Sequence, residues 1–567
     1  MEPHSIMSFL KLALLLFLPV ALASPVKRSA PTVTISSPEA TIVGQWGIAV
    51  ERFNGIPFAQ PPTGNLRLRP PQPIQSPLGT ISAKGQAKSC PQMSSSIKTD
   101  KIPDNVTETL KKVPLMQQEN DTEEDCLTLN VHRPAGTTAK DKLPVLVWIY
   151  GGGFESGSSS TYDGGVLVSS SKLMDMPIIF VAMNYRVGGF GFMPGAEILA
   201  DGAANLGLLD QRLALEWVAD NIALFGGDPS KVTIWGESAG SISVLDQMLL
   251  YDGDTNYKGS PLFRGAMMNS GTIVPADPVD GVKGQAVYDA VVAAAGCSSA
   301  DDTLSCLRGL DYDDFANAAN SVPGITSYNS VALSYLPRPD RKTMTDSPDK
   351  LIKAGKYAPV PFIAGDQEDE GTLFALFQSN LTTTEDLVEY FKTLFFYGAT
   401  EDQIRDLVAT YQTITTDGSP FRTGIFNNWY PQYKRLAAIL GDLTFTLTRR
   451  AFLKYASEVK PDVPSWSYLS SYNYSTPILG TFHGSDILQV FYGILPNYAS
   501  RSIHSYYFSF IYDLDPNKRS DKYMNWPQWS DGQNLMHFFA HHGELLKDNF
   551  RDDTYQFLLA NVDSLHI

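Results

Sequence analysis

The sequence predicts an α/β protein built around one large, mostly parallel sheet. Short runs rich in Val, Ile and aromatic residues alternate along the chain with segments of helical periodicity. These runs are apolar almost throughout, as in strands whose two faces are both covered by helices. No linker, repeat or long low-complexity tract divides the 567 residues, so we expect a single domain over 29–567.

Four of the apolar runs are predicted to be buried strands, and one long segment among them is predicted to be a helix. The strands are expected at 144–150, 177–185, 231–235 and 360–366. The helix is expected at 208–225, where the apolar stripe consists of Leu209, Leu213, Trp217 and Ile222. A strand, a helix and a strand in this order form the crossover unit of a parallel sheet. Functional residues are therefore expected beyond the carboxyl ends of the strands.

The N-terminus has the features of a secretory signal peptide. Lys11 precedes an apolar run of about a dozen residues, which is too short for a bilayer span of ~20 residues. Ala21-Leu22-Ala23 matches the small-x-small pattern of a cleavage site. We predict a signal peptide at 1–23, a secreted protein, and further processing after Lys27-Arg28 as a second candidate for the mature start. No other segment is long and apolar enough to span a membrane.

Cysteine usage, charge and sequons narrow the class of protein. The cysteines are even in number, as expected of an exported chain with disulfides, and three pairings are open: Cys90, Cys126, Cys297 and Cys306. Paired histidine ligands and Cys-x-x-Cys spacings are missing, so no metal site is expected.

The net charge of −16 offers no basic face for nucleic acid. Sequons that would carry glycan where exposed are Asn105, Asn120, Asn380 and Asn473.

The stretch IWGESAGSIS at 234–243 contains a candidate nucleophile, Ser238. The G-x-S-x-G pattern alone is a weak indication, because chance produces it with odds of about 0.2 in a chain of this length. Its context is stronger, since a predicted strand precedes it and Ile242, Val244 and Leu245 suit a following helix. Ser238 is therefore predicted on a tight strand-to-helix turn, next to the free N–H groups of a helix start.

The glycine run at 151–154 (GGGF) follows the strand that ends at Tyr150. Glycines let backbone N–H groups turn inward without side-chain obstruction, which suits donors to a developing oxyanion. Gly152 and Gly153 are two candidate donors, and the N–H of Ala239 is the third. A serine nucleophile also needs a base to take its proton and an acid to orient that base.

Candidate acids and bases follow the serine along the chain. Residues 365–374 contain four acids after a predicted strand, and the pattern alone does not choose among Asp366, Glu368, Asp369 and Glu370. Residues 480–487 place His483 between small residues that suit a loop. His537 and His541 have helical spacing, with His542 adjacent, and are predicted to lie on an exposed helix rather than in a metal site.

Three linked motifs resemble the signatures of the type-B carboxylesterase/lipase family, which has the α/β-hydrolase fold. They lie at 53–73 (FNGIPFAQPPTGNLRLRPPQP), 124–131 (EDCLTLNV) and 236–241 (GESAGS), and the resemblance covers essentially the whole mature chain. The family's acid directly precedes a glycine, which selects Glu370, and its base lies in an FHG-like context, which selects His483. The resemblance also implies the disulfides Cys90–Cys126 and Cys297–Cys306.

Three further segments resemble the fungal branch of this family, the Candida rugosa-like lipases and sterol esterases. They are 334–340, 360–375 and 480–500. This resemblance implies hydrolysis of triacylglycerols and steryl esters through an acyl-enzyme, a long acyl tunnel, and a lid in the first disulfide loop. It implies no metal or organic cofactor.

The loop between Cys90 and Cys126 is the predicted lid. Its apolar residues at helical spacing are Ile102, Val106, Leu110 and Val113. Such a helix would cover the pocket in water and turn its apolar face to a lipid interface, and exposed apolar lid surface could also drive self-association. The loop is rich in charge and carries two sequons, so an ungated surface flap is the alternative. It contains no aromatic residue, which argues against a cholinesterase, because quaternary ammonium groups bind aromatic faces.

The sequence thus predicts a secreted serine hydrolase of lipid esters. An alternative specificity, for short-chain, feruloyl or carotenoid esters, would be separated by the dependence of rate on acyl length. A second alternative is a non-catalytic binding domain of the same fold, which the intact Ser238, Glu370 and His483 disfavour. Glu237 is expected to be a structural acid rather than a catalytic one.

Overall fold

The computed structural model describes residues 29–93, 102–113, 121–494 and 496–567. The predicted signal peptide at 1–23 and the sequon at Asn120 lie outside the described residues. In the part that is described, no helix is both long and apolar enough to cross a membrane.

An 11-stranded sheet forms the centre of the molecule, in the order β16-β15-β14-β13-β12-β9-β7-β8-β6-β4-β3. Neighbouring strands are parallel from β15 to β8 and antiparallel at both edges. Its strands are β3 (Gln45–Trp46), β4 (Val50–Pro57), β6 (Thr128–Pro134), β7 (Leu143–Ile149), β8 (Ile179–Met183), β9 (Gly227–Glu237), β12 (Gly265–Asn269), β13 (Phe362–Gln367), β14 (Ser465–Ser470), β15 (Asn534–Phe538) and β16 (Gly543–Lys547). A smaller sheet contains β1 (Thr32–Ser36), β2 (Glu39–Val43) and β5 (Gly79–Ser82), and β10 (Asn256–Tyr257) pairs with β11 (Ser260–Pro261).

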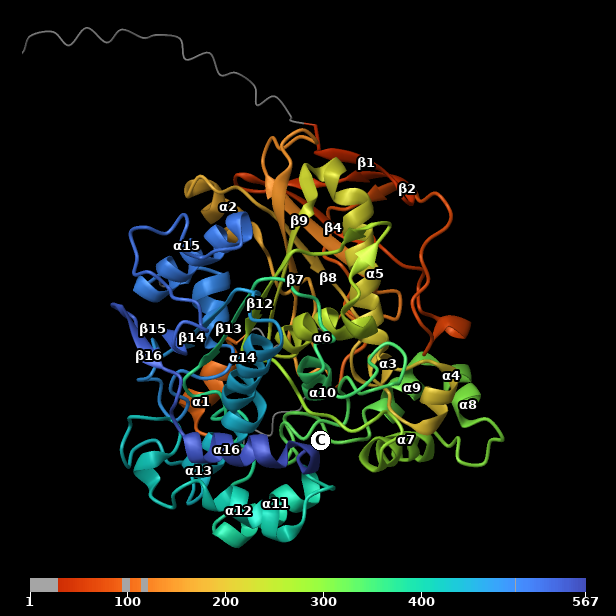
Figure 1. Cartoon of the computed structure of the whole chain (residues 1–567). Helices are drawn as coiled ribbons and strands as arrows, with labels where there is room; N and C mark the ends of the chain where they lie inside the picture. Colours follow the sequence, from red (N-terminus) through yellow and green to blue (C-terminus); the bar gives the residue numbers. More distant parts are fainter. Residues whose placement is uncertain (1–28, 94–101, 114–120, 495) are drawn as a thin grey trace, which may run out of the picture.

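Helices cover both faces of the central sheet, with α2 and α15 on one side and α5 and α6 on the other (Figure 1). The helices are α1 (Asp104–Leu110), α2 (Gly165–Leu173), α3 (Gly188–Gly191), α4 (Ala196–Asp201), α5 (Leu206–Asn221), α6 (Ala239–Gly253), α7 (Val282–Ala294), α8 (Thr303–Gly309), α9 (Tyr312–Ala319), α10 (Pro348–Lys353), α11 (Thr384–Leu394), α12 (Glu401–Ala409), α13 (Tyr433–Gly441), α14 (Leu447–Val459), α15 (Tyr498–Asp513) and α16 (Asp552–Asn561). The predicted strands correspond to β7, β8, β9 and β13, and the predicted helix to α5 and the short turn after it. The central parallel strands are almost fully buried, as expected between two helical layers.

A second apolar cluster lies beside α11, α12 and α13, at the end of the molecule opposite β1 and β2 (Figure 1). The predicted lid stripe belongs to this cluster, because Ile102, Val106, Leu110 and Val113 are all buried in it. The stripe does form a helical segment around α1, while Asn105 and Glu108 face solvent. In this structure the lid therefore turns its apolar face inward.

All four cysteines are paired. The disulfides join Cys90 to Cys126 and Cys297 to Cys306, with sequence separations of 36 and 9 residues. These are the pairs that the family resemblance implies. The first disulfide closes the loop that contains α1.

The prediction of an exposed helix around His537 and His541 is wrong. His537 lies in β15, where it is buried and its Nε2 is 2.6 Å from Ser471 Oγ. β15 and β16 form an antiparallel edge pair in which His537 lies opposite Glu544. The residues between the two strands form the turn, so the i,i+4 spacing of the two histidines reflects a hairpin and not one face of a helix.

Candidate active site

Ser238 lies between β9 and α6, at the carboxyl end of a central strand. Its backbone has φ 60° and ψ −128°, a conformation that a residue with a Cβ adopts only under strain. Two hydrogen bonds hold it there: the Ser238 N–H donates to Asn269 O at 3.0 Å, and its carbonyl accepts from the N–H of Ile242 at 2.9 Å. The turn therefore fixes the direction of the hydroxyl before any ligand arrives.

The imidazole of His483 lies between Ser238 and Glu370 and contacts both. Its Nε2 is 2.8 Å from Ser238 Oγ, and its Nδ1 is 2.5 Å from Glu370 Oε2. With a proton on Nδ1, the imidazole donates to Glu370 and accepts from the serine hydroxyl. Glu370 is held in turn by the N–H of Gln367, which donates to Oε1 at 2.6 Å. Ser238, Glu370 and His483 are all buried.

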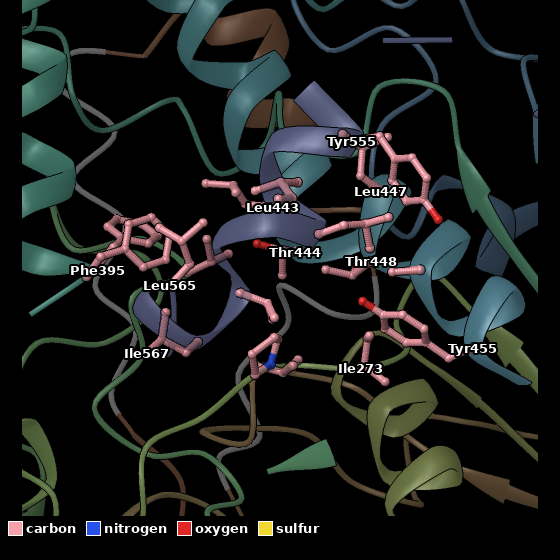
Figure 2. A pocket seen from close by; sticks show the side chains of 18 residues that line it. Ile273, Phe395, Leu443, Thr444, Leu447, Thr448, Tyr455, Tyr555, Leu565 and Ile567 are labelled. Atoms are coloured by element: carbon pink, nitrogen blue, oxygen red, sulfur yellow. The ribbon is translucent and has the colours of Figure 1, made fainter. Parts of the chain in front are cut away.

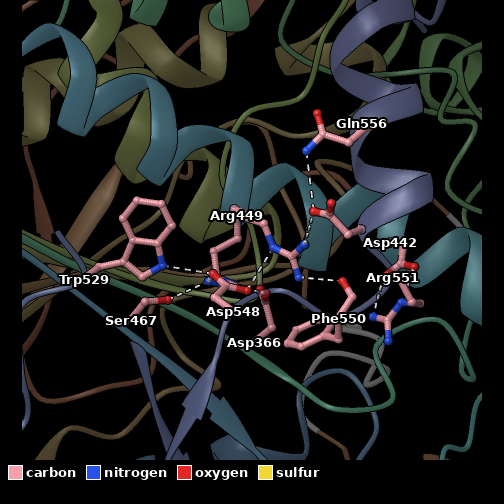
Figure 3. Close-up of polar contacts among 11 residues, drawn as sticks. Asp366, Asp442, Arg449, Ser467, Trp529, Asp548, Phe550, Arg551 and Gln556 are labelled. Atoms are coloured by element: carbon pink, nitrogen blue, oxygen red, sulfur yellow. Dashed lines mark hydrogen bonds and ion pairs between the residues drawn. The ribbon is translucent and has the colours of Figure 1, made fainter. Parts of the chain in front are cut away.

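The four acids in and after the end of β13 have different partners. Asp366 accepts from Arg449 Nε at 2.7 Å, in a buried network that also includes Asp548 and Trp529 (Figure 3). Glu368 forms an ion pair with Arg422 near the surface. Of the four carboxylates, that of Glu370 contacts the imidazole, in agreement with the choice that the family resemblance makes.

Asp369 positions the loop that carries His483, a role that the sequence pattern does not reveal. Its Oδ2 accepts from the N–H of Thr481 at 2.9 Å, and its own N–H donates to Thr481 O at 3.0 Å. The imidazole then packs against Phe374 and Phe445, with ring centroids 5.0 and 4.5 Å away. The base is thus fixed both by the backbone of its loop and by two aromatic rings.

The glycine run after β7 forms a tight turn next to Ser238. Gly152 and Gly153 have φ of 119° and 63°, conformations that L side chains rarely adopt. The N–H groups of Gly152, Gly153 and Ala239 make no hydrogen bond to another described residue. Gly153 and Ala239 line the cavity beside Ser238, and Gly152 directly precedes Gly153 in the glycine turn. These N–H groups are therefore available as donors.

Two buried acids near the site carry raised pKa values. Burial raises the pKa of Glu155 to about 8, although the N–H of Ile325 donates to its Oε2 at 2.7 Å. Burial raises the pKa of Glu237 well above its usual value, and the nearby charges of Asp486 and Glu370 add to this. Glu237 Oε1 lies 3.4 Å from His483 Nε2. Burial thus favours the uncharged form of both carboxyl groups.

Two apolar cavities meet near Ser238. The first is lined by Ser238 and Ala239 together with mostly apolar residues. The second, shown in Figure 2, is larger, and Ser238 is not among its lining residues. The two have four wall residues in common: Val274, Val331, Thr444 and Ile567. Apolar cavities therefore lie on both sides of this shared wall, one beside the serine and the other lined by Phe395 and Tyr455.

A family model described as the carboxylesterase family matches residues 30–558. The chain belongs to this family. Membership confirms the predicted family, the α/β-hydrolase fold and the enzyme class, a carboxylic ester hydrolase. The match covers the sheet, the serine turn and both disulfides, so these features belong to one family architecture.

Relatives of the chain include two fungal enzymes and one solved structure. "Secreted lipase 1" of Botryotinia fuckeliana is 62% identical over 543 residues, which are 95% of each chain. A "Secreted triacylglycerol lipase" of Gibberella zeae is 60% identical over 550 residues, 96% of this chain and 93% of that one. The crystal structure of Aspergillus niger EstA is similar with a TM-score of 0.79 and 26% identity, covering 95% of this chain and 99% of that one.

Proposed function

We propose that the chain is a secreted serine hydrolase of long-chain carboxylic esters, with Ser238 as nucleophile, His483 as base and Glu370 as the acid that orients the base. The observation that carries this proposal is the pair of hydrogen bonds made by His483, to Ser238 Oγ at 2.8 Å and to Glu370 Oε2 at 2.5 Å. A base held by an acid on one nitrogen and facing a serine hydroxyl on the other is the arrangement that activates a serine.

The reaction proceeds in two halves. His483 Nε2 takes the proton of Ser238 while Oγ attacks the ester carbonyl carbon, and Glu370 stabilises the imidazolium that forms. The N–H groups of Gly152, Gly153 and Ala239 bind the oxygen that becomes negative in the tetrahedral intermediate. His483 then gives its proton to the leaving alcohol oxygen, which leaves an acyl group on Ser238. Water, activated by the same base, attacks the acyl carbon and releases the carboxylic acid.

The apolar cavities support a long acyl chain as the substrate group. An acyl chain bound at Ser238 would lie in the first cavity and continue into the second past Val331 and Thr444. Burial of each CH₂ group contributes about 0.8 kcal/mol, so long chains gain most from such a path. Two relatives at 60% identity or more are named lipases, and one is named for triacylglycerols, which supports lipid esters as the class.

The lid and the export signals are part of the same proposal. With its apolar face packed inward, α1 would have to leave the second apolar cluster before that face could meet a lipid interface.

Asn105 and Asn380 are exposed and suit glycosylation, whereas Asn473 is half-buried and its side-chain oxygen accepts from Gln489 Nε2 at 3.3 Å. Nothing in the described residues supports self-association, which stays a prediction.

The test is hydrolysis of emulsified triolein, cholesteryl oleate and tributyrin by the purified protein and by Ser238→Ala. We expect turnover of triolein by the wild type and a loss of at least about 10⁴-fold in Ser238→Ala, with unfolding unchanged. Ser241→Ala, which removes another buried hydroxyl of the same motif, should retain activity. Full activity of Ser238→Ala would contradict the nucleophile, and hydrolysis of tributyrin alone would contradict the lipid class. The cholesteryl oleate rate decides whether sterol esters belong to the substrates.

A further inference from the structure

A cluster of possible metal ligands lies away from the serine, where α10 meets the residues that follow α16. Asp349 belongs to the first turn of α10, Asp563 to the short turn after α16, and His566 to the segment beyond it. Each side chain offers one ligand atom, and these atoms all lie within 4.8 Å of one another. The three residues thus converge on one point, although Asp349 is distant in the sequence from Asp563 and His566.

Two of the three residues are buried with a polar atom that lacks a hydrogen-bond partner. Asp349 is 0% exposed, and its Oδ1 accepts from Ser347 Oγ at 2.6 Å, but its Oδ2 makes no hydrogen bond to any described residue. His566 is 8% exposed, and its Nε2 likewise makes none. A buried polar atom that makes no hydrogen bond is unfavourable, and a bound cation would give both atoms a direct partner.

The charged neighbours leave room for a cation. Lys353 Nζ is 3.6 Å from Asp349 Oδ2, and Lys350 Nζ is 3.7 Å from Asp563 Oδ1, so both ammonium groups lie beyond hydrogen-bond distance. Both lysines are partly exposed and can swing into solvent. On the other side of the imidazole, Asp277 Oδ1 is 3.8 Å from His566 Nδ1. This distance too is beyond a hydrogen bond, so Asp277 would have to move closer to become the carboxylate support that a metal-binding histidine usually has.

We propose that Asp349, Asp563 and His566 bind one divalent transition-metal ion, with Zn²⁺ the best match to their donor atoms. One imidazole nitrogen and two carboxylates are ligands that zinc takes at about 2.0–2.2 Å, and water would complete the tetrahedron. Ligand atoms around such an ion lie about 3.3 Å apart. His566 Nε2 and Asp349 Oδ1 are 3.6 Å apart, and Asp563, whose side chain is 79% exposed, can move to close the set.

The ion would tie together residues that line the two cavities. Leu565 and Ile567, on either side of His566, line the larger cavity, and Pro348, which precedes Asp349, lines the cavity beside Ser238. Zinc would therefore hold one wall of the apolar space in place without touching the reacting atoms. The sequence predicts no metal site because paired histidines and Cys-x-x-Cys spacings are missing from it. The present set contains one histidine and two aspartates and therefore has neither pattern.

Zinc binding to the full chain tests the proposal directly. After removal of metal with a chelator, zinc is titrated by calorimetry, and thermal unfolding is followed with and without excess zinc. We expect one saturable site per chain and a rise in Tm of about 2–5 °C. His566→Gln and Asp563→Asn should each weaken zinc binding by at least about 10-fold. His542→Gln removes an exposed histidine at another surface and should leave the binding unchanged.

Two further measurements, on Lys353→Gln and with calcium, distinguish a metal site from an ion-pair cluster. Lys353→Gln should strengthen zinc binding, because it removes a cation that competes for Asp349. If Lys353→Gln instead loses stability and binds no zinc, the residues form an ion-pair cluster. Calcium should bind much more weakly than zinc, since an imidazole is a poor ligand for it. The proposal is overturned if micromolar zinc gives no saturable binding, if His566→Gln binds zinc as the wild type does, or if His542→Gln abolishes the binding.

Discussion

At the scale of single residues, the site depends on which side chain contacts the imidazole of His483. Glu370 and Glu368 lie two positions apart after β13, yet Glu370 contacts His483 Nδ1 and Glu368 contacts Arg422. Replacing the orienting acid by its amide favours the wrong imidazole tautomer, so the base no longer faces the serine. We expect Glu370→Gln to lower kcat by about 10⁴-fold, measured on tributyrin and triolein. Glu368→Gln is the matched control and should stay within a few-fold of the wild type; equal losses in the two variants would contradict the assignment.

Glu155 makes stability depend on pH. Burial raises its pKa in the folded protein to about 8 from an ordinary value of 4.5. The folded state thus keeps a proton that the unfolded chain releases, and the stability from this group, complete below pH 4.5, is lost as pH rises toward 8. Glu155→Gln removes this dependence. The gain in stability of this variant over the wild type should therefore be larger at pH 8 than at pH 5, by up to about 4 kcal/mol.

The measurement is the free energy of unfolding of both proteins in denaturant at pH 5 and pH 8. Glu389→Gln, on the exposed side of α11, controls for the loss of a carboxylate. A difference between Glu155→Gln and the wild type that is the same at both pH values would show that Glu155 does not keep its proton on folding.

The sequence pointed to the residues proposed to react more clearly than to the residues that hold them. Ser238 follows from a motif with a predicted strand before it and a predicted helix after it. Glu370 could not be separated from three neighbouring acids by pattern, and the family resemblance was needed to choose it. Asp369 and Glu155 were missed because their roles depend on contacts with Thr481 and Ile325, which are distant in the sequence.

At the scale of elements, the strand-to-helix turn depends on how closely α6 approaches β7. A Cβ on Gly240 would lie 2.0 Å from Ile149 O, which is backbone of a central strand and cannot move aside. We expect Gly240→Ala to destabilise the protein by about 3 kcal/mol or more, measured as the free energy of unfolding. Gly309, at the end of α8, has open space around it, so Gly309→Ala should be neutral or stabilise by up to about 1 kcal/mol. Equal stability of the two variants would mean that the close packing of α6 on β7 is not needed.

Strands and helices were predictable where their burial produces a clear apolar pattern in the sequence. The central strands are apolar on both faces, and α5 has a clear stripe, so both were found with ends shifted by a few residues. The edge pair β15 and β16 was missed because its residues are part buried and part exposed, and two histidines four apart imitate a helix. The helix in the first disulfide loop was predicted from its apolar stripe, but the residues of its cluster were not, since these come from 331 to 482 and from Leu565.

At the scale of the whole molecule, residues of the second apolar cluster and of the main hydrophobic core together line the two cavities. Val331 and Thr444 lie at their common wall, whereas Ala451 lines the larger cavity alone. The selectivity for acyl length should therefore depend on where along this space a side chain is enlarged. A bulky residue near the serine would exclude more of an acyl chain than one placed further away.

Val331→Phe should block the passage between the cavities, so the rate on triolein should fall by about 10-fold or more while the rate on tributyrin stays within a few-fold. Each methylene excluded from the apolar space loses about 0.8 kcal/mol, and two such groups already account for a tenfold loss. Ala451→Phe leaves the passage open and should reduce only the longest chains. The measurement is kcat/KM over a series of triacylglycerols of increasing chain length. If Val331→Phe lowers the rates on all chain lengths equally, the larger cavity does not receive the acyl chain, and the lipid class must then be explained by the first cavity alone.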